Sequence, residues 1–368
     1  MTRVVFETAS LADAVREAAI VAPTRGEAFD KAAGIVLEIR DGQCIVKATD
    51  HRLWYMQWIT PLEIDGPPVR WRLSSKLFAD VVTRLPMTSA TRFILESDRT
   101  AVKMVHGKKR GSFQLIPMDN YELWPPFDPD TLTEVDQMAQ RIAQVEWAAS
   151  AKINPPYSGI HFTGESIVAT DRQKFATAPL KVDGLKEPVT VPAGLLGRVI
   201  KSTDAPKVGA DENQMLIMPD PHTQIAATIF GVGYPPIERV MKRERPQYVT
   251  VNKSYLLDAM QVALAFAEGD RQPIMRTFWG METIAVMLEN TEAGHLGDEI
   301  DVPGQADHPR IEIKFNPDYI IPALEHCQTT EIKIGYDPGN LSKPLYIDAG
   351  EGCEFWVAPT RGVPGADG

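Results

Sequence analysis

Two hydrophobic periods alternate along the chain, one of two residues and one of three to four. The first is typical of a β-strand with one buried face, and the second of an amphipathic α-helix. The N-terminal stretch shows both, because a short alternating run is followed by apolar residues at helical spacing as far as residue 22. The apolar positions of this first predicted helix are Leu11, Val15, Ala18, Ala19 and Ala22. The chain is therefore predicted to open with a strand and a helix.

The same strand-helix unit recurs twice, at intervals of about 120 residues. The second predicted helix follows residue 133 and has apolar residues at Met138, Ile142, Val145 and Ala149. The third follows an alternating strand at 248–251, and its apolar positions are Leu256, Leu257, Met260, Ala263 and Leu264. Recurrence at a fixed period indicates a structural unit that is repeated along the chain.

Each copy continues into a predicted β-hairpin. Residues 34–50 contain the turn dipeptide Asp41-Gly42, which is a strong local signal for a hairpin. The corresponding turn residues of the other two copies are Gly164-Glu165 and Gly280-Met281. The hairpins fall in the same order in all three copies, which makes a chance recurrence implausible.

A second strand and helix follow each hairpin, over residues 70–86, 189–202 and 311–327, and further strands come after them. This order predicts an α+β protein of three tandem copies of one domain, each built from two strand-helix-strands units, with six helices in all. Pro-rich and charged stretches at 121–131 and 242–247 mark the joints. We expect the domains at 1–125, 126–246 and 247–361, followed by a tail at 362–368.

One short motif stands at the same place in the first two copies. A predicted strand ends in Ala-Thr-Asp at 48–50 and again at 169–171, and a basic and then a large apolar residue follow. The third copy has Leu288-Glu289-Asn290 at this position. The motif stands at the end of the same strand in a duplicated domain, so its shared part is predicted to have a structural role. The residues that follow it are predicted to distinguish the two copies in function.

Composition and charge narrow the function classes. The 368 residues are 44% hydrophobic and 24% charged, as in soluble globular proteins, and no apolar run nears the roughly 20 residues of a membrane helix. No signal peptide opens the chain, so a cytoplasmic location is predicted. Cys44, Cys327 and Cys353 form no C-x-x-C pair, which favours buried free thiols. A net charge of −11 excludes nucleic-acid binding by the whole surface but allows a local basic patch.

In this order and number, the repeats resemble the bacterial sliding clamp family, the beta subunit of DNA polymerase III. Three motifs carry the resemblance. ATDRQKFA at 169–176 is similar to the family's Ala-Thr-Asp-Gly-His-Arg-Leu-Ala, GYPPIERV at 233–240 to its Phe-Pro-Asp-Tyr-x-Arg-Val, and FWVAPTR at 355–361 to its Tyr-Val-Val-Met-Pro-Met-Arg. Residues 315–327 also resemble the helix that precedes this end in the family. On these motifs the chain is identified as a divergent member.

The resemblance implies a head-to-tail homodimer closed into a ring, with helices lining the hole and sheets forming the outer wall. Such a clamp is not an enzyme: it encircles duplex DNA without sequence preference and acts as a DNA polymerase processivity factor. The resemblance also implies that polymerase and clamp loader insert short peptides into a groove between the second and third domains. No cofactor and no metal are expected.

A ring that slides has to neutralise phosphates without reading bases, because base contacts would hold it in place. Lysines and arginines on or beside the predicted helices are therefore the candidates for facing DNA. They are Arg16, Arg25, Lys76, Arg84, Arg141, Lys152, Arg198 and Lys201. The alternative is that they belong to ordinary solvated helix faces.

A head-to-tail ring also needs a seam between subunits, for which opposite charges around an apolar centre are suited. The first domain offers a basic strand, and the third offers Phe266 and a predicted acidic loop around 289–301. The expected seam residues are Lys108, Lys109, Arg110, Phe113, Leu115, Phe266, Glu292, Asp298 and Glu299. Both segments could instead be solvated loops.

The partner groove is carried over from the family motif by motif. Its expected lining is Thr170, Arg172, Lys174, Phe175, Leu180, Pro235, Arg239, Val240, Val357, Ala358, Pro359, Thr360 and Arg361. The chain departs from the family where Arg172-Gln173-Lys174-Phe175 replaces Gly-His-Arg-Leu, and where Ala358 and Thr360 replace two methionines. Met lines promiscuous grooves, so its loss suggests a narrower set of partners. The tail at 362–368 is either disordered or a flap over the groove.

Two other function classes remain open. The stretches around His51 and His295 to His308 hold acid-base and metal-ligand residue types, which a metal-dependent hydrolase would need. However, no H-E-x-x-H, G-x-S-x-G, P-loop or dinucleotide motif is present. The other class is a clamp-shaped interaction protein that does not encircle DNA.

Overall fold

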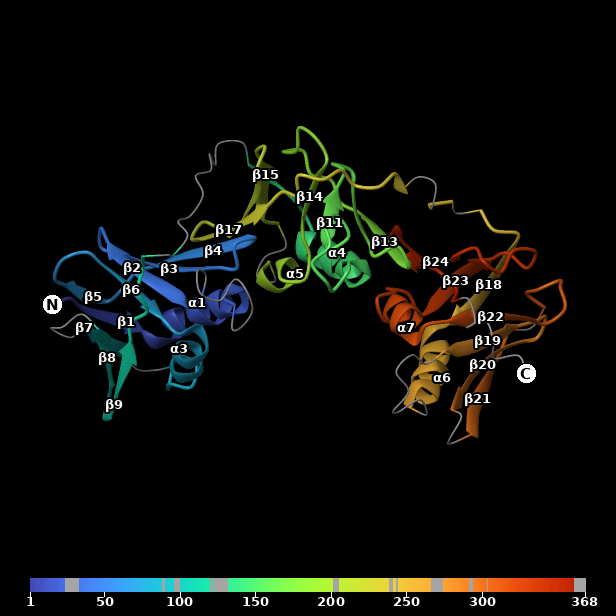
Figure 1. The fold of residues 1–368 in the computed structure, drawn as a ribbon, viewed down its shortest axis with the longest axis horizontal. Coiled ribbons are helices and arrows are strands. Elements are labelled where there is room, and N and C mark those ends of the chain that lie inside the picture. Colours follow the sequence, from blue (N-terminus) through green and yellow to red (C-terminus); the bar gives the residue numbers. More distant parts are fainter. Residues whose placement is uncertain are drawn as a thin grey trace. The chain divides into compact units, whose positions relative to one another are not determined.

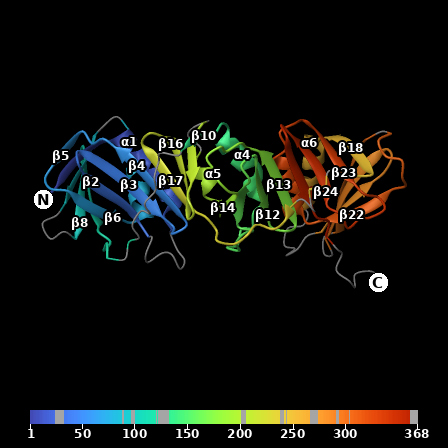
Figure 2. The same ribbon diagram turned by 90° about the horizontal axis from the view of Figure 1, so that it is seen from above.

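The computed structural model describes residues 1–23, 33–87, 90–95, 100–119, 121, 132–200, 205–237, 241–242, 244–265, 274–290, 294–302 and 304–360 (Figures 1 and 2). Within these ranges, no helix combines the length and the apolar character needed to cross a membrane.

Where it is described, the first third of the chain alternates strands with two helices, as predicted. Its elements are β1 Arg3–Glu7, α1 Thr8–Val21, β2 Ile35–Arg40, β3 Gln43–Thr49, β4 Leu53–Ile59, β5 Glu63–Asp65, β6 Val69–Leu73, α3 Ser75–Val82, β7 Ala90–Leu95, β8 Ala101–His106 and β9 Lys109–Gln114. Apart from the three-residue β5, the order is strand, helix, three strands, strand, helix, three strands.

The other two thirds repeat this order. The second has β10 Thr133–Glu134, α4 Met138–Val145 with the 3-10 turn Glu146–Ala148, β11 Gly159–Phe162, β12 Ser166–Thr170, β13 Lys174–Pro179, β14 Val189–Pro192, α5 Leu196–Val199, β15 Lys207–Ala210, β16 Gln214–Asp220 and β17 Thr223–Thr228. The third has β18 Gln247–Asn252, α6 Lys253–Ala265, β19 Met275–Trp279, β20 Thr283–Asn290, β21 Gly294–Asp301, β22 Ile311–Phe315, α7 Pro317–Glu325, β23 Glu331–Tyr336, β24 Leu345–Gly350 and β25 Cys353–Val357. The α+β class, the threefold repeat and a helix at each of the six predicted places are confirmed.

The predicted hairpin turns are present, and the first shows why its sequence favours one. Asp41 and Gly42 have φ angles of 52° and 77°, and two consecutive positive φ angles match the twist of the flanking strands. The strands then pair from Arg40 opposite Gln43 to Val36 opposite Lys47. Gly164 likewise has a φ of 97° between β11 and β12.

The chain divides by its contacts into two compact units. Unit 1 contains Met1–Ala139 and Lys181–Gly231, and unit 2 contains Gln140–Leu180 and Val232–Gly368. In unit 1, one sheet has the order β5-β1-β7-β8-β9 and a second has the order β10-β15-β16-β17-β4-β3-β2-β6. In Figure 2 the strands β2, β3, β4 and β17 of this second sheet lie side by side.

In unit 2, one sheet contains β11, β12, β13, β25, β24, β23 and β18 in this order, and a smaller one has the order β21-β20-β19-β22. The middle third of the chain is thus shared. Its strand β17 pairs with β4 of the first third, and its strand β13 pairs with β25 of the third. The expected boundaries near 125 and 246 stay a prediction, because the sheets continue from one third into the next.

In each unit, two helices pack against each other and bury one face (Figure 1). Leu11 and Val15 of α1 and Phe78 of α3 are fully buried in unit 1, and the Phe78 ring meets the Phe113 ring edge-on at 5.2 Å. In unit 2, α6 buries Leu256 and Met260, and α7 buries Ile320 and Leu324. The opposite helix faces remain exposed and carry polar residues together with a few apolar ones, among them Leu77, Tyr255 and Val262.

Candidate binding site

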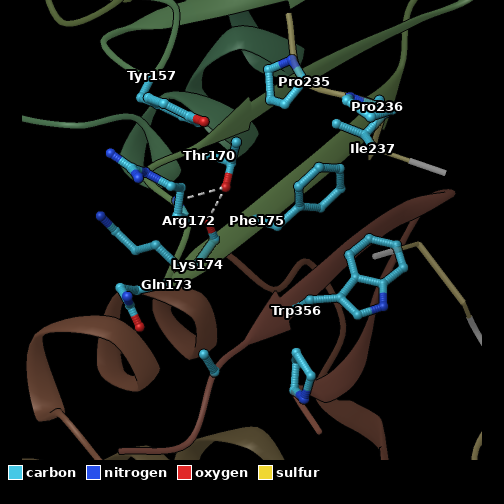
Figure 3. A pocket seen from close by; sticks show the side chains of 12 residues that line it. Tyr157, Thr170, Arg172, Gln173, Lys174, Phe175, Pro235, Pro236, Ile237 and Trp356 are labelled. Carbon is cyan, nitrogen blue, oxygen red and sulfur yellow. Dashed lines mark hydrogen bonds between the residues drawn. The ribbon is translucent and has the colours of Figure 1, made fainter. Parts of the chain in front are cut away.

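A cavity of about 170 Å³ lies within unit 2, beside the turn that follows β12 (Figure 3). Its walls come from β13, from the loop before residue 238 and from the end of β25. The lining residues are Tyr157, Thr170, Arg172, Gln173, Lys174, Phe175, Pro235, Pro236, Ile237, Pro344, Trp356 and Ala358. The mixture of aromatic rings, prolines and two cations suits an occupant with apolar side chains and a polar backbone.

The Ala-Thr-Asp motif builds the rim of this cavity. The Thr170 hydroxyl accepts a hydrogen bond from the Arg172 amide at 3.0 Å and donates to the Lys174 carbonyl at 2.7 Å. Asp171 Oδ1 accepts hydrogen bonds from the amides of Gln173 and Lys174, both at 2.9 Å. These side-chain bonds satisfy the backbone of a tight turn and fix the direction in which β13 begins.

The first copy of the motif forms the same turn. Thr49 Oγ1 accepts a hydrogen bond from the His51 amide at 2.9 Å, and Asp50 Oδ1 accepts from the amides of Arg52 and Leu53 at 2.9 and 2.7 Å. The prediction that Thr and Asp are architectural is therefore confirmed by their hydrogen bonds. The two copies differ in the side chains that the turn presents.

An aromatic cluster forms the floor of the cavity. The rings of Phe175 and Trp356 meet edge-on at 5.1 Å, and Trp356 contacts Tyr346 with a centroid separation of 5.5 Å. Trp356 is 1% exposed, and its Nε1 donates to the carbonyl of Lys242 at 3.4 Å. Ile237 and Tyr234 pack against the same cluster from the loop. The floor is thus a rigid apolar surface that belongs to the core of unit 2.

The two cations at the rim differ in their surroundings. Lys174 Nζ lies 2.9 Å from Asp171 Oδ2, and both side chains are largely buried. The Arg172 side chain is exposed and lies over the Tyr157 ring, 4.6 Å from its centroid (Figure 3). A cation over an aromatic face is attracted by the ring, so this contact favours a position of the guanidinium beside the cavity.

Beside the cavity, the Tyr234 ring stacks on His161 at 4.3 Å with an angle of 4° between the rings. Burial raises the pKa of the Tyr234 hydroxyl above its usual value. This stack supports the loop that carries Pro235, Pro236 and Ile237.

The structure brings together six of the thirteen predicted groove residues. Those that line the cavity are Thr170, Arg172, Lys174, Phe175, Pro235 and Ala358. Leu180 and Val357 are buried in the core at 4% and 0% exposure, and Pro359 and Thr360 lie outside the lining. Arg239, Val240 and Arg361 lie outside the described residues.

Sequence reasoning missed Trp356, although the signal was present. Successive residues of a strand point to opposite faces, so a strand that presents Ala358 to a cavity presents Trp356 to it as well. Val357 points to the other face for the same reason, and its side chain is fully buried. The other lining residues that were not predicted are Tyr157, Gln173, Pro236, Ile237 and Pro344.

Of the cations predicted to face DNA, five lie on exposed surface. Arg16 on α1 is paired with Asp13 at 2.7 Å, and Arg84, which is 80% exposed, lies 3.9 Å from Asp80. The other exposed ones are Lys76 on α3, Lys152 after the 3-10 turn and Arg198 on α5. Arg25 and Lys201 lie outside the described residues.

Arg141 differs from the other cations, because its guanidinium is largely buried and forms an ion pair within unit 2. Its side chain is 11% exposed, and Nη1 lies 3.2 Å from Glu351 Oε2 and 3.4 Å from Cys353 Sγ. Gln144 Oε1 accepts from the same nitrogen at 3.1 Å and from the Cys353 thiol at 2.9 Å. This network ties α4 to the turn before β25, so we do not keep Arg141 among the cations proposed to meet DNA.

Five of the nine predicted seam residues lie on two edge strands, β9 and β21. β9 is the last strand of its sheet, with Lys109 and Arg110 exposed at its start and Phe113 buried, and Lys108 is exposed in the turn just before it. Leu115, just after β9, is half-buried. Phe266 and Glu292 lie outside the described residues.

The acidic segment of the third domain is not the loop that the sequence suggested. Residues 294–301 form β21, which pairs with β20 from Thr283 opposite Asp301 to Asn290 opposite Gly294. Ile300 is buried and Leu296 is half-buried, while Asp298 and Glu299 are exposed. The charged residues of this segment hide the alternation of apolar and polar positions that is typical of a strand. Pairing with β20 nevertheless provides hydrogen-bond partners for its backbone N–H and C=O groups. The acids therefore lie on an edge strand rather than on a loop.

The three cysteines are buried free thiols, as predicted. Burial raises the pKa of Cys44, of Cys353 and of Cys327, for the last to about 12. Among the described residues, no three His, Cys, Asp or Glu side chains are grouped as metal ligands.

Three strand-helix-strands repeats, each with two helices, and sheets that continue between repeats define a DNA-clamp fold. Crystal structures of bacterial DNA polymerase III beta subunits share it over nearly the whole chain. That of Thermotoga maritima has a TM-score of 0.84 at 19% identity and covers 98% of this chain and 100% of its own. That of the Bacillus subtilis sliding clamp has a TM-score of 0.82 at 18% identity, with the same coverage.

Sequence comparison leads to the same proteins. The beta sliding clamp of Bacillus subtilis strain 168 is 21% identical over 281 residues, which cover 72% of this chain and 73% of that protein. A further structural match is the Pseudomonas aeruginosa sliding clamp bound to griselimycin, with a TM-score of 0.82 at 16% identity. No family model matches the chain. The resemblance to bacterial sliding clamps that the sequence motifs indicated is confirmed.

Proposed function

We propose that this protein is a DNA polymerase processivity factor, a sliding clamp that encircles duplex DNA and tethers replication or repair proteins to it. The observation that carries the proposal is the clamp fold, which extends over 98% of the chain. This role needs no catalytic step and no cofactor, and the protein would act by topology and by binding.

The cations on exposed helix faces support the DNA part of the proposal. Arg16, Lys76 and Arg198 belong to the helices of the first two expected domains, Arg84 lies in the turn just after α3, and Lys152 follows α4. A few such contacts neutralise phosphates without reading bases, which leaves the ring free to slide.

The third expected domain presents a different helix surface. The exposed positions of α6 include Tyr255, Asp258, Gln261 and Val262, and the Lys253 ammonium of the same helix donates to the Cys327 carbonyl. The exposed charges of α7 are Asp318 and Glu325. We therefore infer that phosphate contacts concentrate on the first two domains.

A closed ring requires a second copy of the chain, and the two edge strands offer a seam. An edge strand leaves a row of backbone N–H and C=O groups available for pairing with another chain. We propose that β9 of one protomer, with Lys109 and Arg110, pairs with β21 of the partner, which carries Asp298 and Glu299. Opposite charges favour this head-to-tail pairing over contacts between like edges.

Retention on circular DNA tests the proposal. The protein is incubated with a circular duplex at a concentration at which dimers exchange subunits, and DNA-bound protein is then separated from free protein by gel filtration. We expect the protein to remain on the circle at high salt and to leave when a restriction enzyme linearises the DNA, because only topology holds it. Equal retention on circular and linear DNA would contradict encirclement and favour the clamp-shaped interaction protein.

The cavity of unit 2 is proposed as the partner-peptide site. Ala358→Trp should weaken binding of a fluorescent peptide with a Leu-Phe pair by at least about tenfold, because the indole fills space that anchor side chains need, and 1.4 kcal/mol suffices for this factor. Fluorescence anisotropy measures the affinity. Ala265→Trp places the same side chain on the exposed end of α6 and should leave the affinity unchanged. Equal binding by both variants would place the peptide elsewhere.

A further inference from the structure

We propose that Arg172 selects partner segments that carry a carboxylate next to their apolar anchor residues. The inference rests on the proposed function, because it concerns what enters the same cavity. It assigns to one residue a part of the specificity that the fold alone does not determine.

The backbone conformation at Arg172 does not require an arginine side chain. Arg172 has a φ of 81°, in the left-handed region where glycine is favoured and other residues are strained. His51 has a φ of 69° at the same position of the first turn, so the angle follows from the turn itself. The resembling family has glycine at the Arg172 position, which would form the turn without strain. An arginine here adds a strained residue to the turn and, in return, a cation to the cavity.

The side chain lies where an occupant would meet it. Arg172 and Tyr157 both line the cavity, and the guanidinium carbon lies 4.6 Å from the centroid of the Tyr157 ring (Figure 3). This cation–π contact holds the guanidinium beside the cavity, and an arginine can donate two parallel hydrogen bonds to a carboxylate. The position is at the rim, where a partial contact with water limits the cost of desolvation.

The charge balance of the cavity favours an acidic occupant. Arg172 and Lys174 are the two charged residues of the lining, and neither is an acid. Asp171 neutralises Lys174 at 2.9 Å. Within the described ranges, no ion pair joins Arg172 to a carboxylate. Among the described residues, the positive charge of Arg172 therefore has no acid paired with it, and it stands beside an apolar floor.

The occupant that fits both features is a peptide with one or two large apolar residues and an adjacent Asp or Glu. Its apolar side chains would pack against Phe175, Trp356 and Ile237, which line the cavity. Its carboxylate would receive the N–H groups of Arg172. A peptide with an uncharged residue at the acidic position would keep the apolar contacts and lose the ion pair.

Two pairs of capped pentapeptides test this inference on the full-length protein. Each pair contains a Leu-Phe dipeptide, with Glu or Gln before it in one pair and after it in the other. We expect the protein to prefer the Glu peptide in at least one pair by about fivefold to tenfold at low salt, as a charge-assisted contact at a partly exposed site allows. The preference should shrink as salt rises, because salt screens the attraction.

The ratio of the two affinities is the readout, since it does not depend on the overall strength of binding. Arg172→Gly and Arg172→Gln should each bring the ratio close to one. His51→Gly makes the same backbone change in the other turn and should preserve the wild-type ratio, and circular dichroism checks that every variant is folded.

The outcomes separate the inference from the function on which it rests. If the wild-type protein binds no peptide of either pair, the partner-site proposal fails as well. If it binds Glu and Gln peptides equally, or if the Arg172 variants keep the preference, only the role of Arg172 is wrong. A last outcome concerns a variant that lacks residues 361–368. If the wild-type protein binds the Glu and Gln peptides with equal affinity, and if this variant binds all of them more tightly, the cavity would be assigned to the C-terminal end of the chain. This result would overturn the inference.

Discussion

Replacing Lys109 and Arg110 with glutamate is expected to leave the protein as a monomer of 40.8 kDa. Both side chains are exposed at the start of the edge strand β9, and the proposed partner strand β21 carries Asp298 and Glu299. Charge reversal would place acids opposite acids, and such a juxtaposition costs several kcal/mol. The dimer dissociation constant should rise by at least about a hundredfold, which needs roughly 2.8 kcal/mol. Sedimentation equilibrium over a range of concentrations measures it.

A matched control and a rescue make this prediction sharper. Lys186→Glu with Lys207→Glu introduces the same charge change at exposed positions away from both edge strands, and should preserve the dimer. Adding Asp298→Lys and Glu299→Lys to the β9 variant should restore association, because the charges are again opposite. A β9 variant that remains a dimer as tight as the wild type would show that the subunits meet elsewhere.

Trp356→Ala is expected to destabilise the protein by about 3–5 kcal/mol, the range for removing a large buried aromatic side chain. Trp356 is 1% exposed, packs on Phe175 and Tyr346, and donates a hydrogen bond to the Lys242 carbonyl. The substitution removes the floor of the cavity together with a part of the unit 2 core. Urea unfolding followed by circular dichroism measures the loss, and separate transitions for the two units would be fitted separately.

Trp356→Phe is the matched variant, because it keeps an aromatic ring and removes the indole N–H. It should cost clearly less than Trp356→Ala, since the ring still fills most of the space. If Trp356→Ala costs less than about 1 kcal/mol, the aromatic cluster contributes little to the stability of unit 2, and the rigid floor described above would be wrong.

The elements that could be predicted are those whose signal lies within a few neighbouring residues. Asp41-Gly42 specified a hairpin because two positive φ angles are required there, and both are present. Thr49-Asp50 and Thr170-Asp171 specified one turn twice, because each side chain bonds to amides two or three residues ahead. The threefold order of strands and helices followed from the hydrophobic periods together with the repeated Ala-Thr-Asp motif and the turn residues.

The features that could not be predicted depend on contacts between distant parts of the chain. The charge on Arg141 was expected to face outward, but it is used by Glu351, which is 210 residues away. The acidic segment at 294–301 was expected to be a loop, but its pairing with β20 makes it a strand. Pro344 enters the cavity lining from a segment that carries none of the recognised motifs.

The candidate site was half foreseen for the same reason. The motif residues Thr170, Phe175 and Pro235 could be carried over, whereas Tyr157 reaches the cavity from a loop with no recognisable pattern. Which cation at the rim is neutralised also depends on geometry. In the sequence Arg172 directly follows Asp171 and Lys174 stands three residues after it, yet the turn brings Lys174 into pairing distance.

The middle third of the chain contributes strands to two sheets, and this affects how the protein can be divided into fragments. A chain cut near residue 246 would separate β13 from β25, and a chain cut near residue 125 would separate β17 from β4. Each fragment would then expose a strand edge whose natural partner lies on the other fragment. Such fragments should recombine with one another or aggregate rather than persist alone, and complementation between separately expressed pieces becomes a practical route to a split reporter built on this fold.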